Sequence, residues 1–506
     1  MRKSAFVLLL CFSFLGAESP RGLYQRLDPT SIPQHLALYQ RYPDSPEGKQ
    51  ALADAWALLG GDPASAQSLQ ATQDLALAIP RLLSLLQGSA DKAVELSESE
   101  LALIEQLSAC LPHHQLAFSA CTQTPTLSDL KKAPFDLARV LLLSQCPDNL
   151  AAIRSYEALL DLMALQVRAR VPENPSPDQL ITEINRLLFS DLWFRFPPHS
   201  KYAEDIDEYT FLTSVLDGRR GVCLGISTLY LCLAQRLGLD LEIVTPPGHI
   251  YVRYRDADRT INIETTARGV HLDNRIYLSV NTRSLQQREL WELPAMAFFN
   301  QAAVHWRDED PKAAQAAYAR ALSWSPDDPH IKQFYGLASL CAGDLELAHQ
   351  LLSETVDYVP DDVVSGDTLA KDVLSGRVDG EGIAAVLMHV DESRGSIEAK
   401  QRRLRAVLER FPDFQGAWFA LAITYLQLSR PGEALDCLER CHAIQANDIT
   451  VEYYLAALHC QRLNYPAAWR HADLAEAIAN SRNHNPRVLQ ELRSYLMHHS
   501  PKQLGW

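Results

Sequence analysis

The chain has 506 residues, 47% of them hydrophobic and 22% charged, a length that predicts about three domains and excludes a single small core. Its 47 Lys and Arg residues against 62 Asp and Glu give a formal net charge of −15, which argues against binding to nucleic acid or to anionic membrane surfaces. The Ala- and Leu-rich composition, with only 22 glycines, favours a mostly α-helical fold.

The first residues have the order of a secretory signal peptide. Arg2 and Lys3 precede an apolar stretch over 5–17, which is followed by small and polar residues. At 13 residues this stretch is shorter than the roughly 20 that a membrane-spanning helix needs. We therefore expect a signal peptide at 1–17, an exported protein that is periplasmic or secreted, and no integral membrane span after cleavage.

Residues 18–146 are predicted to form an α-helical domain, because apolar residues recur every three or four positions in segments separated by Pro and Gly. Cys110, His113 and His114 lie close together, with Cys121 nearby. Their spacing matches no standard metal motif. We interpret this stretch as a solvent-facing loop and predict no metal site.

The next region, 147–295, is predicted to combine helices with a small antiparallel sheet. Apolar residues recur with helical spacing in four stretches: 150–171, 176–190 with Ser176 as N-cap, 207–218 and 223–237. Four shorter stretches alternate with period two, as strands do: 241–246, 249–254, 260–266 and 276–280. This order of elements indicates an α+β domain.

The sequence then repeats with a period typical of tetratricopeptide repeats. Alanines at matching positions are 34 residues apart, as Ala314 is from Ala348 and Ala434 from Ala468. Each unit of such an array buries its apolar face only against its neighbours, and the array curves. We predict a repeat domain over 296–480 whose groove binds a protein or peptide partner.

The repeat pattern is interrupted at 361–400, which we interpret as an imperfect repeat or an insertion. Cys437 and Cys441 lie one helical turn apart, with His442 beside them. Because two apolar side chains at this spacing face one side of a helix, we interpret them as repeat packing and not as a metal site. A helical tail is predicted over 481–506.

The helix predicted to begin at Cys223 follows the sequence Arg-Arg-Gly-Val. A thiolate attacks carbonyl groups, and the pKa of a thiol falls at a helix N-terminus beside an imidazolium. Gly221 allows a tight turn into the helix, where backbone N–H groups without helical partners can bind an oxyanion. His249, at the start of the second strand, supplies a general base and acid. The alternative is that Cys223 is a small core residue and His249 an ordinary surface group.

A third group is needed to orient the imidazole through its other nitrogen. Asn262 and Glu264 share one face of the third strand, because side chains alternate along a strand. His249, Tyr251 and Arg253 share one face of the preceding strand. Asn262 and Glu264 are therefore both candidates for this role.

The order of Cys, His and acid resembles the transglutaminase-like core of papain-type thiol folds. More narrowly, residues 211–254 look like the bacterial SirB-type transglutaminase-like family, in which this core precedes tetratricopeptide repeats, and the resemblance covers about residues 147–480. The family motifs R-R-G-x-C-L and P-G-H match Cys223 and His249. The position of the family's usual acid, an aspartate, falls on Glu264.

Papain-like enzymes usually complete the oxyanion hole with a glutamine upstream of the nucleophile, and this chain has none between Gln179 and Cys223. Tyr209 or backbone donors alone are therefore the candidates for that role. Asn262 stays the alternative third residue.

We therefore expect a mostly α fold with an α+β papain- or transglutaminase-like core and a C-terminal tetratricopeptide repeat array. Cys223, His249 and Glu264 are the expected catalytic residues of a thiol-dependent hydrolase or acyl transferase that acts on amide or peptide bonds. This chemistry needs no cofactor. The alternative is a non-catalytic scaffold, in which the transglutaminase-like fold is structural and the repeats bind a protein.

Overall fold

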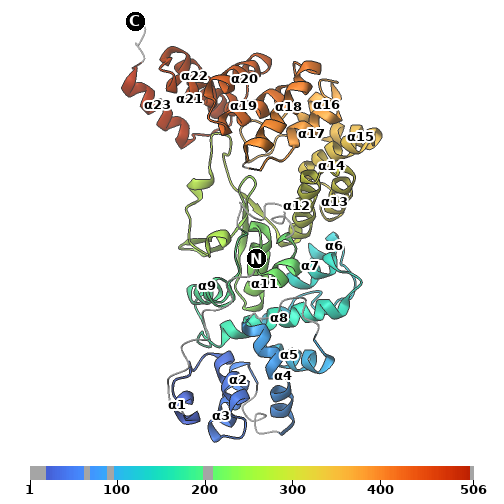
Figure 1. Ribbon diagram of the computed structural model, residues 1–506, viewed down its shortest axis with the longest axis vertical. Coiled ribbons are helices and arrows are strands. Elements are labelled where there is room, and N and C mark those ends of the chain that lie inside the picture. The colour runs from blue at the N-terminus through green and yellow to red at the C-terminus, as the bar shows by residue number, and fades with distance from the viewer. Residues whose placement is uncertain (1–18, 62–68, 88–95, 198–208, 392, 502–506) are drawn as a thin grey trace.

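The computed structural model describes residues 19–61, 69–87, 96–197, 209–391 and 393–501. Three parts follow one another along an elongated molecule, with N-terminal helices at one end, a region around a four-stranded sheet in the middle and a helical array at the other end (Figure 1). The predicted fold class, mostly α with a small antiparallel sheet, is confirmed. The predicted signal peptide at 1–17 lies outside the described residues.

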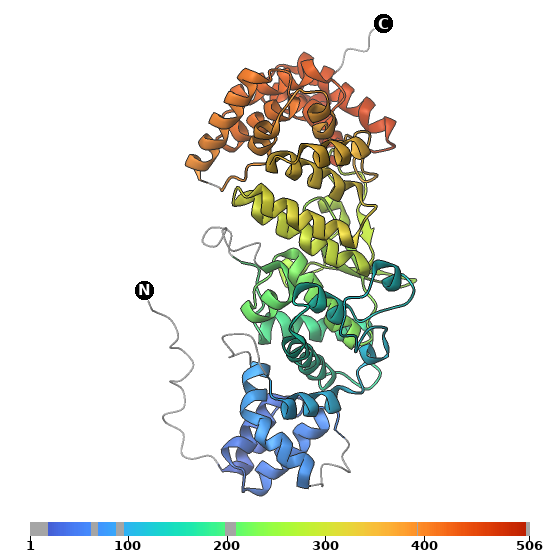
Figure 2. The same cartoon turned by 90° about the vertical axis from the view of Figure 1, so that its right-hand side faces the viewer.

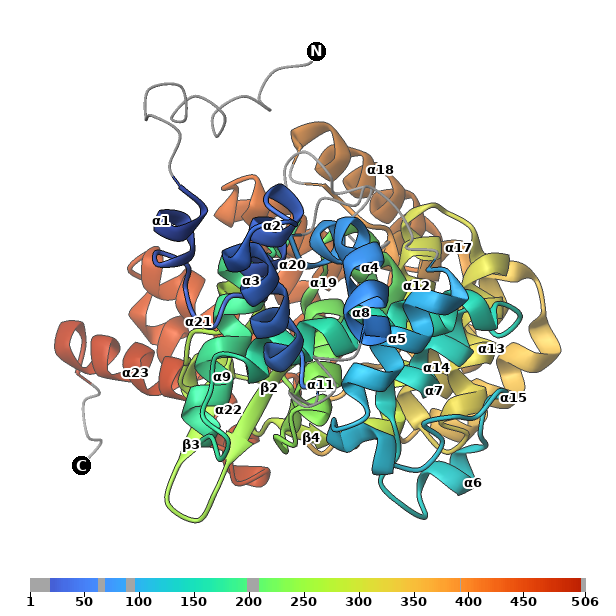
Figure 3. The same ribbon diagram turned by 90° about the horizontal axis from the view of Figure 1, so that it is seen from below.

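The N-terminal part is a group of helices around one apolar core. Its helices are α1 (Pro20–Tyr24), α2 (Ile32–Arg41), α3 (Pro46–Leu58), α4 (Leu69–Gln87) and α5 (Glu98–Ser108). Trp56 and Ile104 are buried in this core together with Leu162 of α8 (Leu150–Arg168). Figure 3 views the molecule from this end and shows α4 and α5 beside α8. The long helix α8 therefore joins the N-terminal part to the middle of the molecule.

The middle part surrounds one central helix. Its further helices are α6 (Leu127–Leu130), α7 (Leu137–Gln145), α9 (Pro177–Asn185), a π-helical turn (Arg186–Asp191), α10 (Leu212–Gly218) and α11 (Cys223–Arg236). Ser176 caps α9, as predicted, by accepting a hydrogen bond from the Gln179 N–H. The predicted start of α11 at Cys223 is also confirmed.

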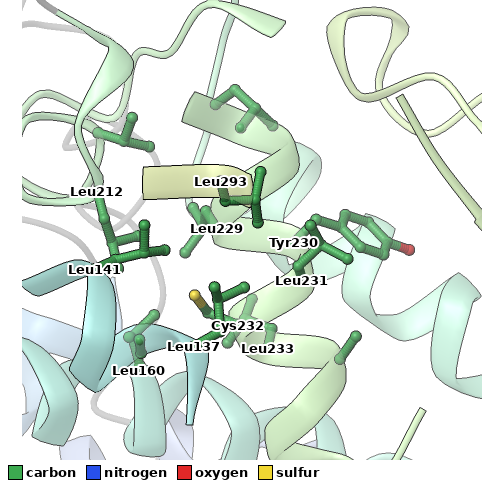
Figure 4. Close-up of a cluster of buried hydrophobic side chains, with 14 of the residues drawn as sticks. Leu137, Leu141, Leu160, Leu212, Leu229, Tyr230, Leu231, Cys232, Leu233 and Leu293 are labelled. Carbon is green, nitrogen blue, oxygen red and sulfur yellow. The ribbon is translucent and has the colours of Figure 1, made fainter. Parts of the chain in front are cut away.

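Helix α11 forms the centre of the core. Neighbouring helices supply apolar side chains to it, among them Leu137, Leu141, Leu160, Leu212 and Leu293 (Figure 4). Cys232 lies inside this cluster, where burial raises the pKa of its thiol to about 12. A helix that is apolar on all sides is typical of such a central position. Cys223 precedes this buried run and is only partly buried.

The sheet is antiparallel, with strand order β3-β2-β1-β4. The strands are β1 (Glu242–Thr245), β2 (Tyr251–Arg255), β3 (Thr260–Ile263) and β4 (Gln286–Arg288). Val252 pairs with Ile263 and Arg253 with Asn262. The first three predicted strands are thus confirmed, with β2 and β3 joined by a tight turn.

The fourth predicted strand, 276–280, is wrong. Residues Asn274–Tyr277 form a 3-10 turn, and the strand beside β1 is Gln286–Arg288 instead. The alternating apolar residues at 276 and 278 misled the prediction, because Ile276 and Leu278 are exposed at 58% and 36%. Tyr277, between them, turns inward and stacks on Tyr251 with ring centroids 5.1 Å apart.

The helical array contains four helix hairpins among the described residues. The pairs are α12 (Leu293–Arg307) with α13 (Pro311–Trp324), α14 (Pro329–Ala342) with α15 (Leu345–Thr355), α19 (Gln415–Gln427) with α20 (Pro431–Ile444), and α21 (Ile449–Gln461) with α22 (Tyr465–Ser481). All four repeat-matched alanines are fully buried, which lets the helices cross closely: Ala314, Ala348, Ala434 and Ala468. Figure 2 shows the hairpins stacked in a curve.

Shorter elements complete the array. Between the second and third hairpins lie α16 (Leu369–Leu374), α17 (Gly380–Leu387) and α18 (Arg394–Arg410), and α23 (Arg487–His499) follows the last hairpin. Cys437 and Cys441 are buried in the array core, as predicted. Within the described part of the chain, none of the helices combines the length and the apolar character that a membrane span requires.

A short segment, 279–283, ties the sheet to the array, and we call it the strap. The Arg283 N–H donates to the Asp362 carbonyl at 2.8 Å, and Asn281 exchanges two hydrogen bonds with the backbone of Ser365. The Arg283 guanidinium also donates to the Arg482 carbonyl, at 2.8 Å, in the loop after α22. The strap therefore joins the sheet region to two separate loops of the array.

Candidate active site

Cys223 is the first residue of α11, and the backbone before it is held in place. Val222 is the extended N-cap residue, and its N–H donates to the Tyr209 carbonyl at 3.2 Å. The same carbonyl approaches Gly225 so closely that a Cβ there would lie 2.3 Å from it. Glycine at 225 is therefore required for segment 209–210 to pack on the first turn of α11. The N–H groups of this turn have no helical acceptors and point toward the Cys223 end.

His249 enters the site from the turn before β2. Gly248 has φ of +68°, a left-handed conformation that glycine adopts without strain, and the His249 N–H donates to the Pro246 carbonyl at 3.0 Å. The imidazole Nε2 lies 2.7 Å from Glu264 Oε2. Cys223 is close enough to the same ring to raise its pKa, and because Nε2 faces Glu264, Nδ1 is the nitrogen left for the thiol. The structure thus brings Cys223, His249 and Glu264 together in this order, and their catalytic roles stay predictions.

Glu264 lies just past the end of β3 and is almost fully buried. Thr266 donates to its Oε1 through both the backbone N–H, at 3.1 Å, and the hydroxyl, at 2.6 Å. The Tyr277 hydroxyl donates to Oε2, the oxygen that also faces His249. Burial by itself would raise the pKa of Glu264, but the hydrogen bonds from His249, Thr266 and Tyr277 outweigh it and lower the pKa to about 2.

The electrostatics of His249 are the counterpart of those of Glu264. Burial by itself would lower the pKa of the imidazole, but the hydrogen bonds to Cys223 and Glu264 outweigh burial and raise the pKa to about 9. An imidazole in this setting favours its protonated form at neutral pH. Its side chain is 23% exposed, so the site is reachable from solvent.

Asn262, the alternative third residue, belongs to a different network. Its Oδ1 accepts from Arg253 Nε at 2.9 Å, and its Nδ2 donates to the Leu272 carbonyl at 2.6 Å and to Asn274 Oδ1 at 2.7 Å. Asn274 also accepts from the Tyr251 hydroxyl. This network fastens the segment 271–277, and with it Tyr277, to the sheet. Asn262 therefore supports the site indirectly, by holding the segment that carries Tyr277.

Tyr209, the candidate for completing the oxyanion hole, contacts α11 through its backbone. Its ring lies against Gly218, where a Cβ would be only 2.9 Å from the ring. Its backbone carbonyl, and not its hydroxyl, is the group that contacts α11. The backbone N–H groups of the first turn of α11, which begins at Cys223, are thus the candidate donors for an oxyanion.

Three further residues belong to the site, and the sequence pattern does not predict their roles. Tyr277 was assigned to a strand, although its hydroxyl contacts Glu264. Ser227 and Thr265 share a buried hydrogen bond of 2.9 Å, which ties α11 to the turn that follows Glu264. The only signal for this link is that Ser227 and Thr228 interrupt a largely apolar helix, where a buried hydroxyl needs a partner.

The raised pKa of His249 predicts how the stability of the protein depends on pH. For His249 the pKa rises from 6.5 to about 9, so its contribution is complete below pH 6.5 and is lost as pH rises through about 9. Solvent screening of the partly exposed ring reduces this contribution to about 1–2 kcal/mol. We expect the difference in free energy of unfolding between wild type and His249→Ala to shrink accordingly from pH 6.5 to pH 9 in urea titrations. His349→Ala, on the surface of α15, is the control, and a difference independent of pH contradicts the assignment.

Metal-ligand side chains lie elsewhere. Among the described residues, three groups of His and carboxylate side chains are close enough to share an ion, and none includes Cys223, His249 or Glu264. One group is His113, His114 and Asp161. The prediction that this stretch faces solvent is wrong for His113, which is 2% exposed and lies 3.4 Å from Asp161.

Helix α8 and Arg236 explain this burial. The Arg236 guanidinium is fully buried and donates to Asp161 at 2.7 Å. Burial, Arg236 and His114 together lower the pKa of His113 to about 2. Because Arg236 already supplies the positive charge that Asp161 requires, this group is a poor site for a metal cation.

Comparison with known proteins assigns two segments of the chain. Residues 154–292 match the family described as Transglutaminase-like superfamily, and residues 295–328 match Tetratricopeptide repeat. No curated protein matches the chain. The matched segments contain the site described above and the hairpin of α12 and α13.

Solved structures of MamA are similar to part of the chain. One, described as MamA 41-end from Desulfovibrio magneticus RS-1, is 14% identical with a TM-score of 0.19, covering 37% of this chain and 97% of that one. Another, described as Crystal structure of MamA protein, is 13% identical with a TM-score of 0.20, covering 37% of this chain and 93% of that one. The chain described here contains a transglutaminase-like domain, followed directly by a tetratricopeptide repeat.

Proposed function

We propose that this chain is an exported, SirB-type transglutaminase-like protein that acts as a thiol-dependent hydrolase or acyl transferase on amide or peptide bonds. The observation that carries the proposal is the position of His249, which lies 2.7 Å from the Glu264 carboxylate and close enough to Cys223 for that residue to raise the pKa of the imidazole. A nucleophile, a proton carrier and a group that orients the carrier are the parts that covalent thiol catalysis requires.

In the proposed reaction, Cys223 and His249 begin as a thiolate–imidazolium pair, and the thiolate sulfur forms a bond to the carbonyl carbon of the substrate amide while the C=O π electrons move to the oxygen. The C–N bond then breaks, His249 gives the proton to the leaving amine, and a thioester remains. Water converts this thioester to a carboxylic acid, whereas an amine converts it to a new amide, and either step restores the thiol. Glu264, held as an anion by its hydrogen bonds, stabilises the imidazolium. Backbone N–H groups at the start of α11 bind the oxyanion.

The helical array is proposed to recruit a protein or peptide to this site. A tetratricopeptide repeat adjoins the transglutaminase-like domain, and such repeats present a curved surface that binds partner segments. Export is proposed from the signal-like sequence at 1–17. N-terminal sequencing of the mature protein checks the cleavage.

The test of the catalytic proposal is the rate at which iodoacetamide alkylates Cys223 between pH 5 and pH 8. All nine described cysteines are free thiols, and burial raises the pKa of most of them, as it does for Cys232 and Cys437. We expect Cys223 to be labelled rapidly near pH 6, and His249→Ala to slow the labelling roughly 100-fold. Peptide mass spectrometry follows each thiol, with the exposed Cys110 as an internal reference.

His349→Ala, on the surface of α15, is the matched control and should leave the rate unchanged. Labelling of Cys223 that is as slow as that of Cys110, and indifferent to His249, would contradict the catalytic proposal. That result favours the alternative, a protein-binding scaffold in which the transglutaminase-like fold is structural.

A further inference from the structure

A cluster of three imidazoles and two carboxylates lies in the last two hairpins of the array, far along the chain from Cys223. Its members come from three consecutive helices, and we call it the His–Glu cluster: Glu439 and His442 of α20, Glu452 and His459 of α21, and His471 of α22. In the sequence, only His442 stands beside other candidate ligands, Cys437 and Cys441. The other members are separated from it by up to 29 positions along the chain, so only the packing of the helices brings them together.

Glu452 is the centre of the cluster and is fully buried. Its Oε1 lies 2.6 Å from His442 Nδ1, and its Oε2 lies 2.7 Å from His471 Nδ1. Each carboxylate oxygen of Glu452 therefore faces one imidazole nitrogen, which fixes the orientation of both rings. Glu452 therefore holds His471 with its second nitrogen turned toward the other half of the cluster.

The second half of the cluster has the ligands for a cation. Glu439 Oε1 lies 3.0 Å from His459 Nε2, and one ligand atom from each of Glu439, His459 and His471 falls within 4.8 Å of the others. The rings of His459 and His471 are parallel within 8°. Since Nδ1 of His471 faces Glu452, its Nε2 is the nitrogen left for an ion. Glu439 is 45% exposed while His459 is 10% exposed, so the ion would have an entry path and a position for water.

We propose that Glu439, His459 and His471 bind one divalent first-row transition-metal ion, with Zn²⁺ as the best-fitting member of this class. Two imidazoles and one carboxylate are a ligand set that Zn²⁺ accepts, whereas Mg²⁺ and Ca²⁺ prefer oxygen ligands alone. A metal-bound histidine usually donates its other N–H to a carboxylate, which fixes the orientation of the ring. Glu452 stands in this position behind His471. The ion would join α20, α21 and α22 by direct bonds.

The experiment measures Zn²⁺ binding to the full chain after removal of metals with a chelator, by equilibrium dialysis and metal analysis. We expect one Zn²⁺ per chain. Glu439→Gln and His459→Ala should each weaken binding at least about 10-fold, and Glu452→Gln, which removes the carboxylate behind His471 and His442, by roughly 10- to 100-fold. Glu433→Gln is the matched control, because Glu433 lies on the same helix with a similar exposure of 41% and pairs with Arg430.

Co²⁺ serves as the second probe, since its visible spectrum separates nitrogen and oxygen ligands from cysteine thiolates. Circular dichroism checks the fold of each variant, and Glu439→Gln, at an exposed position, keeps the test decisive if a buried substitution unfolds the array. Absence of stoichiometric Zn²⁺ in wild type overturns the proposal. Binding that survives Glu439→Gln and His459→Ala, or a thiolate spectrum with Co²⁺, also overturns it. So does loss of binding in His442→Ala alone, which would put the ion on the opposite side of Glu452.

Discussion

Glu264→Gln is expected to slow the alkylation of Cys223 at pH 6 roughly 100-fold and to lower the free energy of unfolding by about 3 kcal/mol. The carboxylate is 3% exposed and faces an imidazole at 2.7 Å. A neutral amide of the same shape cannot stabilise the imidazolium, so the positive charge on His249 loses its partner and the pKa of the ring falls. Stopped-flow labelling and urea titration measure the two effects on the same protein.

Glu264→Asp is the charge-keeping control. It retains the anion but moves it back by one methylene group, and we expect the labelling rate to stay within about 10-fold of wild type. Equal losses in the Asp and Gln variants would mean that the reach of the side chain, and not its charge, is what matters. A Gln variant with the labelling rate of wild type would refute the role of Glu264.

Arg236→Met is expected to cause the largest loss of stability, about 3–5 kcal/mol. The guanidinium is fully buried at the end of α11, donates to Asp161 at 2.7 Å and lies 3.9 Å from Asp136. Methionine fills a similar volume but leaves two buried carboxylates without a cation. Burial raises the pKa of Asp161 and Arg236 opposes this rise. Without Arg236, the negative charge on Asp161 loses the cation that stabilises it. Urea unfolding followed by circular dichroism measures the loss.

The double variant Arg236→Met with Asp161→Leu separates charge from packing. If the loss arises from the stranded carboxylate, the double variant should recover more than half of it, because apolar side chains can replace a buried ion pair. Asp161→Leu alone is measured as well. If the losses of stability of Arg236→Met and Asp161→Leu add up in the double variant, shape and not charge determines the effect.

Local patterns were sufficient to predict much of the middle part. The start of α11 at Cys223 follows from a glycine before a long apolar run, and β2 and β3 follow from clear alternation on both sides of a tight turn. The alanines of the array follow from a regular period, and all of them are buried. These features depend on neighbours in the chain, which is why the sequence alone reveals them.

Features that depend on distant partners were missed or wrong. The edge strand β4 consists of polar residues, so it has no apolar alternation to detect. Tyr277 is placed by stacking on Tyr251 and by Glu264, neither of which is near it in the chain. His113 is buried because α8 and Arg236 pack over it.

The choice between Asn262 and Glu264 illustrates the same limit. Alternation assigns both to one face, but β3 ends at Ile263, and Glu264 begins the next turn. Asn262 stays opposite Arg253 and is covered by the segment that contains Asn274. The covering segment lies outside the strand in sequence. The alternation of side chains within the strand therefore cannot show which of the two residues reaches His249.

The strap has a mechanical consequence. Tyr277, which steadies the Glu264 carboxylate, is separated by only a few residues from Arg283, which is anchored to Asp362 and Arg482. A rotation of the helical array about the sheet would therefore pull on the few residues between Arg283 and Tyr277. A movement of the helical array is therefore coupled, through the strap and Tyr277, to the position of the Glu264 carboxylate.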